Sequence, residues 1–365
     1  MARRLMGVMT ARLAAKKDRR KSLGLTWDRL ARHAMAEGLR IVVFHPHYID
    51  WNHKKISGWE FVKIADDALV WQWKRHKFPR VIYDGAFLYD IRKQPEYLQA
   101  RRKLRTLHVP LFNPALPNKY RLHELLVQTD AGPYIPTTTK IYSVKSCINF
   151  IQKHHWVFLK PVRGSGGRGI IEVRKQADES FQICFETKSQ KRIHRVVHAD
   201  ELRHSLRNLL RKSGFLAQIG VPLISYQEQK IDFRVPLYRD NHGDWQSIGI
   251  ICKLGKKGMP VTNFHSGGTI IPFSQVVAFH KESGFVFPAP ERMIECAKKG
   301  AKAISDAIPN LGLIGIDVGV DIYGNPWMLD FNPRPGRDIM KRKQIDQAMK
   351  YTAQFSKFLI GSEKR

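Results

Sequence analysis

Residues 315–336 read GIDVGVDIYGNPWMLDFNPRPG, and this stretch decides the fold that the sequence predicts. Apolar and polar residues alternate on both sides of a Tyr-Gly-Asn-Pro turn, which is typical of a β-hairpin. Asp330 and Asn332 stand two positions apart, so they project from the same face of one strand. The turn brings Asp317 of the neighbouring strand beside them. Two carboxylates and an amide oxygen form a hard site of the kind that Mg²⁺ prefers.

Another interpretation of this hairpin is that Asp330 and Asn332 only cap the end of a strand. The apolar residues that flank them would then bury a carboxylate without a partner, which costs considerable free energy. The pattern therefore favours a metal site over a strand cap.

A glycine-rich loop, RGSGGRG at residues 163–169, follows a predicted strand at Trp156–Lys160. Glycines let the backbone approach a phosphate closely, and Ser165 adds a donor. The loop is not a Walker A motif, because no Gly-Lys-Ser/Thr ends it and a strand, Ile170–Val173, follows it. A hairpin tip that covers phosphates fits better, although a tight turn without a ligand remains an alternative. The candidate phosphate contacts are Gly164, Ser165, Gly166 and Gly167.

The N-terminal part of the chain predicts a small α/β domain. Leu5–Met9, Leu39–Phe44 and Arg80–Asp84 have the composition of strands, and a helix with an apolar stripe is expected at Trp27–Glu37. Strand, helix and strand at these spacings favour a parallel sheet. The proline-rich stretch Val109–Pro117 indicates a boundary, so we expect this domain to span residues 1–115.

The charge of the chain is strongly positive, with 62 Lys and Arg against 32 Asp and Glu and a net charge of +30. Such a field favours anionic partners, although a generally basic proteome would explain it as well. Nucleic acid is an unlikely partner, because no RNA- or DNA-binding motif accompanies the charge and we expect Trp71, Trp73 and Trp156 to lie in the core.

The four cysteines are far apart and form no Cys-x-x-Cys pair, which argues against a disulfide framework or a zinc knuckle and suits a reducing cytoplasm. No run approaches the ~18 apolar residues of a membrane span. These features lead us to expect a soluble, cytoplasmic protein.

Three segments in order, Val157–Ile170, Leu216–Val235 and Gly315–Gly336, resemble the ATP-grasp superfamily. Stretches near the N-terminus, such as Phe78–Asp84, resemble its YheC/YheD group, bacterial proteins associated with the endospore coat. The resemblance implies an α/β and α+β architecture, in which the ATP-grasp fold follows a pre-ATP-grasp α/β domain. The ATP-grasp domain would span residues 116–345, with a small lobe at about 135–215 and a large lobe at about 216–345. A C-terminal helix or tail would occupy residues 346–365.

The resemblance also implies roles for individual residues. Lys160 and Lys119 match the lysines that contact the phosphates of ATP, and Gln218 stands at the adenine hinge. The backbone from Ile219 to Val221 would face adenine, and Asp232 the ribose. Further matches are the Mg²⁺ ligands Asp317, Asp330 and Asn332, the phosphate-directed Arg234, and the substrate-side Lys253 and Asn263.

Some positions depart from the family pattern. Asp330 replaces the usual glutamate, and Gln218 replaces the commoner hinge glutamate. Gly315 stands where D-alanine ligases carry an arginine that stabilises an oxyanion. Arg334 and Arg337 could supply that positive charge, or they could be solvated loop residues.

The activity implied by the resemblance is that of a carboxylate–amine ligase dependent on ATP and on Mg²⁺ or Mn²⁺. A substrate carboxylate would be phosphorylated and an amine would then displace phosphate, with both substrates unidentified. The rival interpretation is a non-catalytic ATP-binding protein of spore-coat assembly. Spore-coat proteins are then possible partners, and the endospore coat a possible location.

Overall fold

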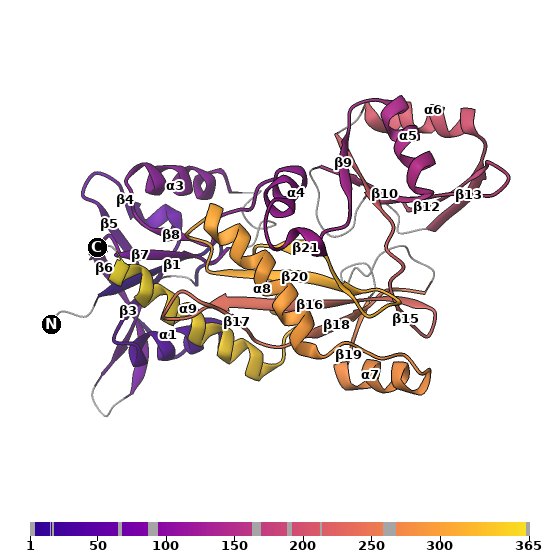
Figure 1. Ribbon diagram of the computed structural model, residues 1–365. Coiled ribbons are helices and arrows are strands. Elements are labelled where there is room, and N and C mark those ends of the chain that lie inside the picture. The colour runs from indigo at the N-terminus through magenta and orange to yellow at the C-terminus, as the bar shows by residue number, and fades with distance from the viewer. Residues whose placement is uncertain are drawn as a thin grey trace.

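The described residues form three β-sheets, each with helices packed against it (Figure 1). The computed structural model describes residues 4–14, 16, 18–64, 68–86, 94–162, 169–187, 192–211, 214–257 and 268–362. The N-terminal sheet lies at one end, the small lobe at the other, and the long strands of the large lobe run between them. This arrangement confirms the predicted ATP-grasp-like combination of α/β and α+β parts.

The N-terminal sheet has the strand order β2-β6-β5-β3-β1-β7-β8, with β4 paired to β5. Its centre is parallel, since β1 pairs in parallel with both β3 and β7, as predicted from the strand–helix–strand pattern. The elements are β1 (Leu5–Met9), β2 (Arg19–Arg20), α1 (Leu25–Ala36), β3 (Arg40–Phe44), η1 (Pro46–Tyr48), β4 (Ile49–Asp50), β5 (Lys55–Lys63), β6 (Leu69–Lys77), β7 (Val81–Asp84), α3 (Pro95–Thr106) and β8 (Leu111–Phe112).

The sequence analysis missed the antiparallel pair β5 and β6, which extends this sheet. Trp59 and Trp71, one on each strand, are fully buried and pack into the core beneath α1. Trp71 was therefore correctly expected in the core. The basic residues at the end of β6 hide the strand pattern, because Lys74, Arg75 and Lys77 follow the aromatic positions directly.

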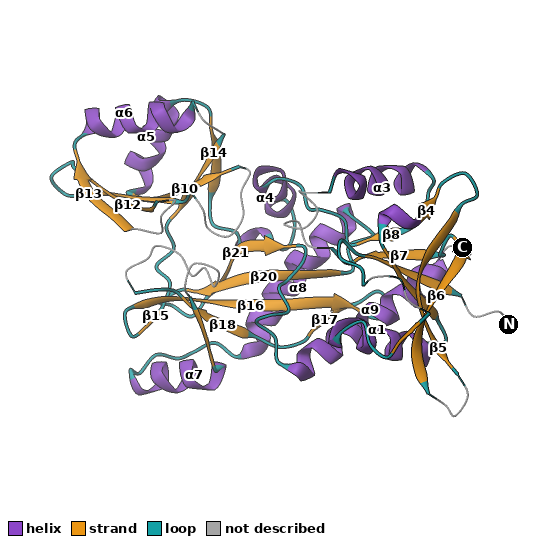
Figure 2. Ribbon diagram, turned by 180° about the vertical axis from the view of Figure 1, so that it is seen from behind, coloured by secondary structure: helices purple, strands orange, loops and turns teal. Residues whose placement is uncertain are grey.

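The small lobe is an antiparallel sheet in the order β13-β12-β11-β10-β14-β9. Helices α5 and α6 cover the face of this sheet that points away from the large lobe (Figure 2). The other face looks toward the large lobe. The elements are β9 (Thr138–Ile141), α5 (Val144–His154), β10 (Trp156–Pro161), β11 (Ile171–Lys175), β12 (Phe181–Glu186), β13 (Arg192–Val197), α6 (Ala199–Leu210) and β14 (Phe215–Ile219).

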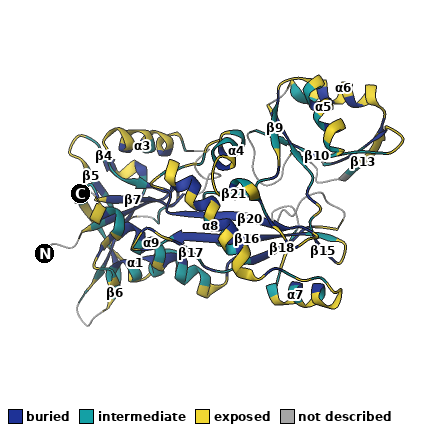
Figure 3. Cartoon of the chain, viewed as in Figure 1, coloured by how far each residue is buried: buried dark blue, intermediate teal, exposed yellow. Residues whose placement is uncertain are grey.

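The large lobe has the strand order β19-β18-β16-β20-β21, and β15 and β17 also pair with β16. Strands β16 and β20 are buried along most of their length (Figure 3), because α8 covers one face of the sheet. The elements are α4 (Lys119–Val127), η3 (Gly132–Tyr134), β15 (Ser225–Tyr226), β16 (Gln229–Arg239), β17 (Trp245–Ser247), β18 (Ile251–Leu254), β19 (Thr269–Ile271), α7 (Phe273–Glu282), α8 (Pro290–Ala307), β20 (Leu313–Val320) and β21 (Pro326–Asn332).

One predicted strand is divided in the structure. The apolar residues in the stretch Trp245–Lys253 predict a single strand, but β17 and β18 are separate strands. Gly249 lies between them with φ of 114°, a conformation that glycine adopts at little cost and that breaks an extended strand.

The C-terminal helix α9 (Arg342–Ser362) packs against α1 of the N-terminal part. Phe355 of this helix is fully buried against Phe112, and a Cβ at Gly312 would lie 2.6 Å from the Phe355 ring. The described part of the predicted tail is therefore helical and belongs to a core.

Among the described residues, no helix is both long and apolar enough to cross a bilayer. The domain boundaries given above stay a prediction.

Candidate functional site

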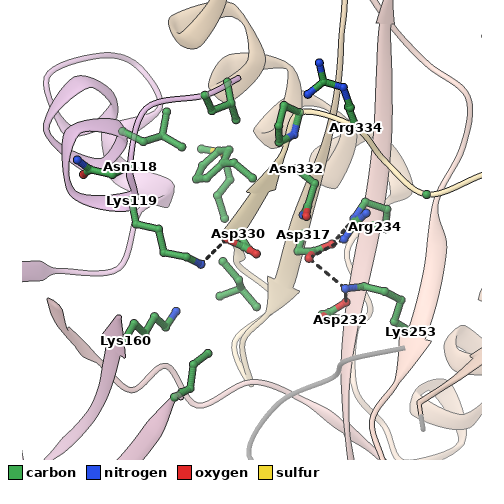
Figure 4. A pocket seen from close by; sticks show the side chains of 18 of the residues that line it. Asn118, Lys119, Lys160, Asp232, Arg234, Lys253, Asp317, Asp330, Asn332 and Arg334 are labelled. Carbon is green, nitrogen blue, oxygen red and sulfur yellow. Dashed lines mark hydrogen bonds and ion pairs between the residues drawn. The ribbon is translucent and has the colours of Figure 1, made fainter. Parts of the chain in front are cut away.

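A cavity of about 1520 Å³ is lined by residues of the small lobe, the large lobe and the N-terminal part. The small lobe contributes side chains from β10 and β14, the large lobe from β16, β18, β20 and β21, and the N-terminal part the segments that follow β1 and β7. Figure 4 shows that lysines from α4 and β10 point toward the carboxylates of the large lobe. The cavity is therefore the candidate site.

The predicted hairpin of β20 and β21 forms the floor of the site. Its turn is held by Asp321, whose carboxylate accepts hydrogen bonds from the backbone N–H groups of Tyr323 and Asn325 and from the Trp327 indole. Asp317 lies on the strand beside Asp330, as the sequence predicted, and pairs directly with it in the register.

A β-bulge at Leu329 sets which side chains face the cavity. Val318 pairs with Met328 while Asp317 pairs with Asp330, so Leu329 is an extra residue on β21. Met328 is buried against α8, because a Cβ at Gly300 would lie 2.4 Å from its sulfur. In a regular hairpin Asp317 would lie opposite Leu329, and the bulge places Asp330 there instead. No pattern in the sequence indicated this irregularity.

A row of buried charges crosses the neighbouring strands in register. Arg234 of β16 lies opposite Asp317, and Asp232 of the same strand lies opposite Lys253 of β18. Arg234 donates through Nε and Nη2 to both Asp317 oxygens, with 3.0 Å for the Nη2–Oδ2 contact. Lys253 Nζ lies 2.8 Å from Asp232 Oδ1 and 3.0 Å from Asp317 Oδ2. Two acids and two bases therefore balance.

The two acids of this row have pKa values shifted in opposite directions. Burial raises the pKa of Asp232 to about 7, although Lys253 opposes the shift. Burial would also raise the pKa of Asp317, but Arg234 and Lys253 outweigh it and hold that pKa far below the usual range. Asp317 is therefore the permanent anion of the row.

Gly315 explains how Arg234 fits. A Cβ at Gly315 would lie 2.8 Å from Arg234 Cδ, so a side chain there would displace the arginine. Arg234 of the neighbouring strand therefore occupies the space beside Gly315.

Two lysines lie across the cavity from the predicted Mg²⁺ ligands (Figure 4). Lys119, the first residue of α4, donates to Asp330 Oδ1 at 2.7 Å. Lys160 of β10 donates to the side-chain oxygen of Gln218, and the Gln218 amide donates to Thr138 Oγ1 at 2.9 Å. Burial, together with Lys119, lowers the pKa of Lys160 to about 8.

Asn332 is the third member of the predicted metal set. Its side-chain nitrogen is buried and has no hydrogen-bond partner among the described residues. The amide is therefore free to turn its oxygen toward the site. No group of three His, Cys, Asp or Glu side chains in the described part of the chain could hold a metal alone. The set of Asp317, Asp330 and Asn332 contains only two such acids, and Mg²⁺ usually takes its remaining ligands from substrate phosphates. The donor set therefore fits Mg²⁺.

Comparison with known proteins places this geometry. The family model described as YheC/D like ATP-grasp matches residues 108–359. The chain belongs to the YheC/D-like ATP-grasp family. It is 26% identical over 356 residues to the endospore coat-associated protein YheD of Bacillus subtilis, covering 93% of this chain and 74% of that protein. The endospore coat-associated protein YheC of the same organism is 22% identical over 333 residues, with 87% and 86% covered.

Solved structures share the fold of this YheC/D-like protein. D-cycloserine synthetase DcsG superposes with a TM-score of 0.52 at 15% identity, over 96% of this chain and 99% of that one. The macrocyclase MdnC of Microcystis aeruginosa, bound with the precursor peptide MdnA, gives 0.50 at 12% identity, over 98% and 99%. At such identities the likeness concerns the fold alone.

The hinge between the lobes of this family member lies beside the lysines. Ile219 donates its backbone N–H to the Thr137 carbonyl, and Gly220 donates to that of Trp156. The backbone N–H of Val221 has no partner among the described residues. Trp156 was expected in the core but lines the cavity instead, with the Arg174 guanidinium 4.0 Å from the centre of its ring.

The remaining predicted site residues are the glycine-rich loop, Asn263 and Arg334. Gly164, Ser165, Gly166, Gly167 and Asn263 fall outside the described residues. Arg334 lines the cavity but is not a solvated loop residue, since it is buried and paired with Asp84 of the N-terminal sheet. Sequence reasoning missed Asp84, because its partner is 250 residues away and no local pattern joins the two.

The buried row predicts a stability effect. Asp317→Asn would leave Arg234 and Lys253 facing one carboxylate, so we expect the free energy of unfolding to fall by about 3–5 kcal/mol. The double variant Asp317→Asn/Lys253→Met restores the balance and should be less destabilised than the sum of the single changes. Chemical denaturation measures all three proteins. Wild-type stability for Asp317→Asn would contradict this account.

Proposed function

We propose that this protein is an ATP- and Mg²⁺-dependent ligase that activates a carboxylate as an acyl phosphate for attack by an amine. The observation that carries the proposal is the convergence of Lys119 and Lys160 on the Asp317–Asp330–Asn332 set in one cavity between two lobes. Membership of the YheC/D-like ATP-grasp family supports it. Cations opposite a hard oxygen site are what a triphosphate with its metal requires.

The hinge would bind adenine through the backbone. The N–H of Val221, which has no partner in the described part of the chain, would offer a donor, and the carbonyl of Ile219 would provide an acceptor on the same segment. Trp156 and Phe158 line the cavity nearby and offer apolar surface for a base. Asp232 remains the predicted ribose contact, although Lys253 occupies one of its oxygens in this structure.

Asp317, Asp330 and Asn332 would hold Mg²⁺. When bound, the ion would neutralise and orient the phosphates. Lys119 would then move its contact from Asp330 to phosphate oxygens, since the metal takes over neutralisation of that carboxylate. In the described residues Asp330 has no other cationic partner, so the exchange keeps every charge paired.

The chain's own residues would supply positioning and charge. The substrate carboxylate attacks the γ-phosphate, the bond to ADP breaks, and the amine then displaces phosphate from the acyl phosphate. Arg234 and Lys253 lie on the side of Asp317 away from Asp330 in the strand order and would face the transferred group. Because phosphoryl transfer needs little covalent help, such fixed charges provide most of the catalysis.

The rival function, a non-catalytic ATP-binding protein of spore-coat assembly, is favoured by the names of the relatives YheD and YheC, which are endospore coat-associated. The two functions differ in turnover. A coat-assembly role predicts nucleotide binding without release of ADP.

The test uses hydroxylamine, which traps acyl phosphates as hydroxamates. With Mg²⁺, ATP and a panel of amino acids, acidic peptides and wall precursors, we expect hydroxamate and ADP in equal amounts for at least one acid. Lys160→Met should lower this rate by about 100-fold or more. The exposed control Lys302→Gln should match the wild type, since Lys302 pairs only with Asp306 on the surface. Tight ATP binding with no ADP for any acid would favour the rival.

Nucleotide binding should also take up a proton. Because the pKa of Lys160 is about 8, roughly half of its amines are neutral at pH 8, and nearby phosphate oxygens favour the charged form. Calorimetry of Mg-ADP binding at pH 8 in two buffers of different ionisation heat should therefore show uptake of up to about half a proton. Lys160→Arg stays charged and should show none. Equal heats in both buffers for the wild type would contradict the prediction.

A further inference from the structure

A second group of charges lies where the N-terminal sheet meets the loop after β21. Asp84, the last residue of β7, is 1% exposed. Arg334 Nη2 lies 2.8 Å from Asp84 Oδ2, Arg101 of α3 forms a second ion pair with that oxygen, and Tyr97 Oη lies 2.9 Å from Oδ1. We call these four residues the Asp84 cluster.

The charges of the Asp84 cluster do not balance. One carboxylate faces two guanidinium groups, and burial raises the pKa of Tyr97 well above its usual value, so the phenol stays neutral. The side chains of Arg334 and Arg101 are only 7% and 13% exposed. A buried excess of positive charge is costly unless an anion compensates it.

Arg334 also has hydrogen-bond donors to spare. Its Nη2 donates to the Asn113 carbonyl at 2.9 Å, besides the contact with Asp84. Nε and Nη1 carry three of the five N–H groups of a guanidinium. Both atoms are buried and have no hydrogen-bond partner among the described residues. Such donors normally have an acceptor.

The cavity connects this arginine with the proposed metal ligands. It extends from Asp330 and Asn332 to Arg334 and on to Thr10 and Gly85, which follow β1 and β7. Arg334 lies on the far side of Asn332 from Lys160 (Figure 4). It is two residues beyond Asn332, so the Cα atoms of the two residues are at most about 7 Å apart. A short diacid can span such a distance.

We propose that Arg334 binds a second anionic group of the acceptor acid, a carboxylate or a phosphate, while the reacting carboxylate lies toward Asp330 and Asn332. The bound anion supplies acceptors to Nε and Nη1 and cancels the excess charge of the Asp84 cluster. Guanidinium contacts with oxyanions are among the stronger hydrogen bonds in proteins. The anion site stands on its own residues, whereas its assignment to the acceptor acid rests on the proposed function.

The test titrates the nucleotide-free full chain with inorganic phosphate and with acetate at constant ionic strength, followed by calorimetry. All proteins carry Lys160→Met, so that the lysine end of the cavity contributes little. Arg334→Gln should weaken anion binding at least about tenfold. Arg203→Gln, the same change at a surface arginine of α6 that pairs only with Asp200, should leave it within about twofold.

Each outcome decides the anion site. If Arg334→Gln and its Lys160→Met parent bind phosphate and acetate with equal affinity, the bound anion is an adventitious ion only, and the proposal is overturned. If Arg334→Gln does not fold, Arg101→Gln replaces it, because that change leaves Asp84 and Arg334 as a neutral pair. Weaker anion binding by Arg101→Gln supports the site, and unchanged binding overturns it. A preference for phosphate over acetate would identify a phosphorylated acid, and the reverse a second carboxylate.

A separate titration tests the acceptor assignment. In the otherwise unchanged protein with Mg²⁺ and ADP, glutarate should bind at least about tenfold more tightly than acetate, because its two carboxylates reach both ends. Equal affinity would overturn the diacid assignment. The first titration uses no nucleotide, so its failure overturns the anion site alone, whereas absence of nucleotide binding would count only against the proposed function.

Discussion

The pairing of Asp317 with Arg234 and Lys253 is the interaction on which the site depends. Three adjacent strands, β18, β16 and β20, bring these side chains together in register, so each charge is opposed at fixed distance inside a sheet that α8 covers from behind. A buried carboxylate without such partners would take up a proton, and it could then no longer bind a metal ion as an anion. The row keeps Asp317 charged and holds two cations where a substrate can reach them.

Each part of the protein contributes different charged side chains to the cavity around this row. The large lobe supplies the carboxylates on paired strands, and the bulge at Leu329 places Asp330 directly opposite Asp317. The small lobe and α4 bring the lysines, which in this structure contact Gln218 and Asp330. Arg334, which pairs with Asp84 of the N-terminal sheet, lines the cavity at the opposite end together with the segments that follow β1 and β7. Charges that would meet a nucleotide and charges that would meet an acid thus lie at two ends of one space.

Much of this could be predicted from the sequence. The alternation in residues 315–336 correctly predicted the hairpin and placed Asp317 on the strand beside Asp330, whereas their direct pairing depends on the bulge at Leu329, which alternation does not predict. The parallel N-terminal strands followed from their apolar runs. What could not be predicted arises from contacts distant in sequence. Asp84 meets Arg334 only after the sheets assemble, and Trp156 lines the cavity because the hinge at Gly220 passes directly beneath its ring, leaving no room for a side chain. The β5–β6 pair was hidden by its basic residues.

The most direct test of the central claim is calorimetric binding of ATP with and without Mg²⁺ to the wild type and to Asp330→Ala, in salt high enough to suppress nonspecific anion capture. We expect magnesium-dependent binding by the wild type that the variant loses, because Asp330 would ligate the ion that joins the triphosphate to the hairpin. Equal, magnesium-independent binding by both proteins would mean that the basic surface merely collects phosphate, and would contradict the account.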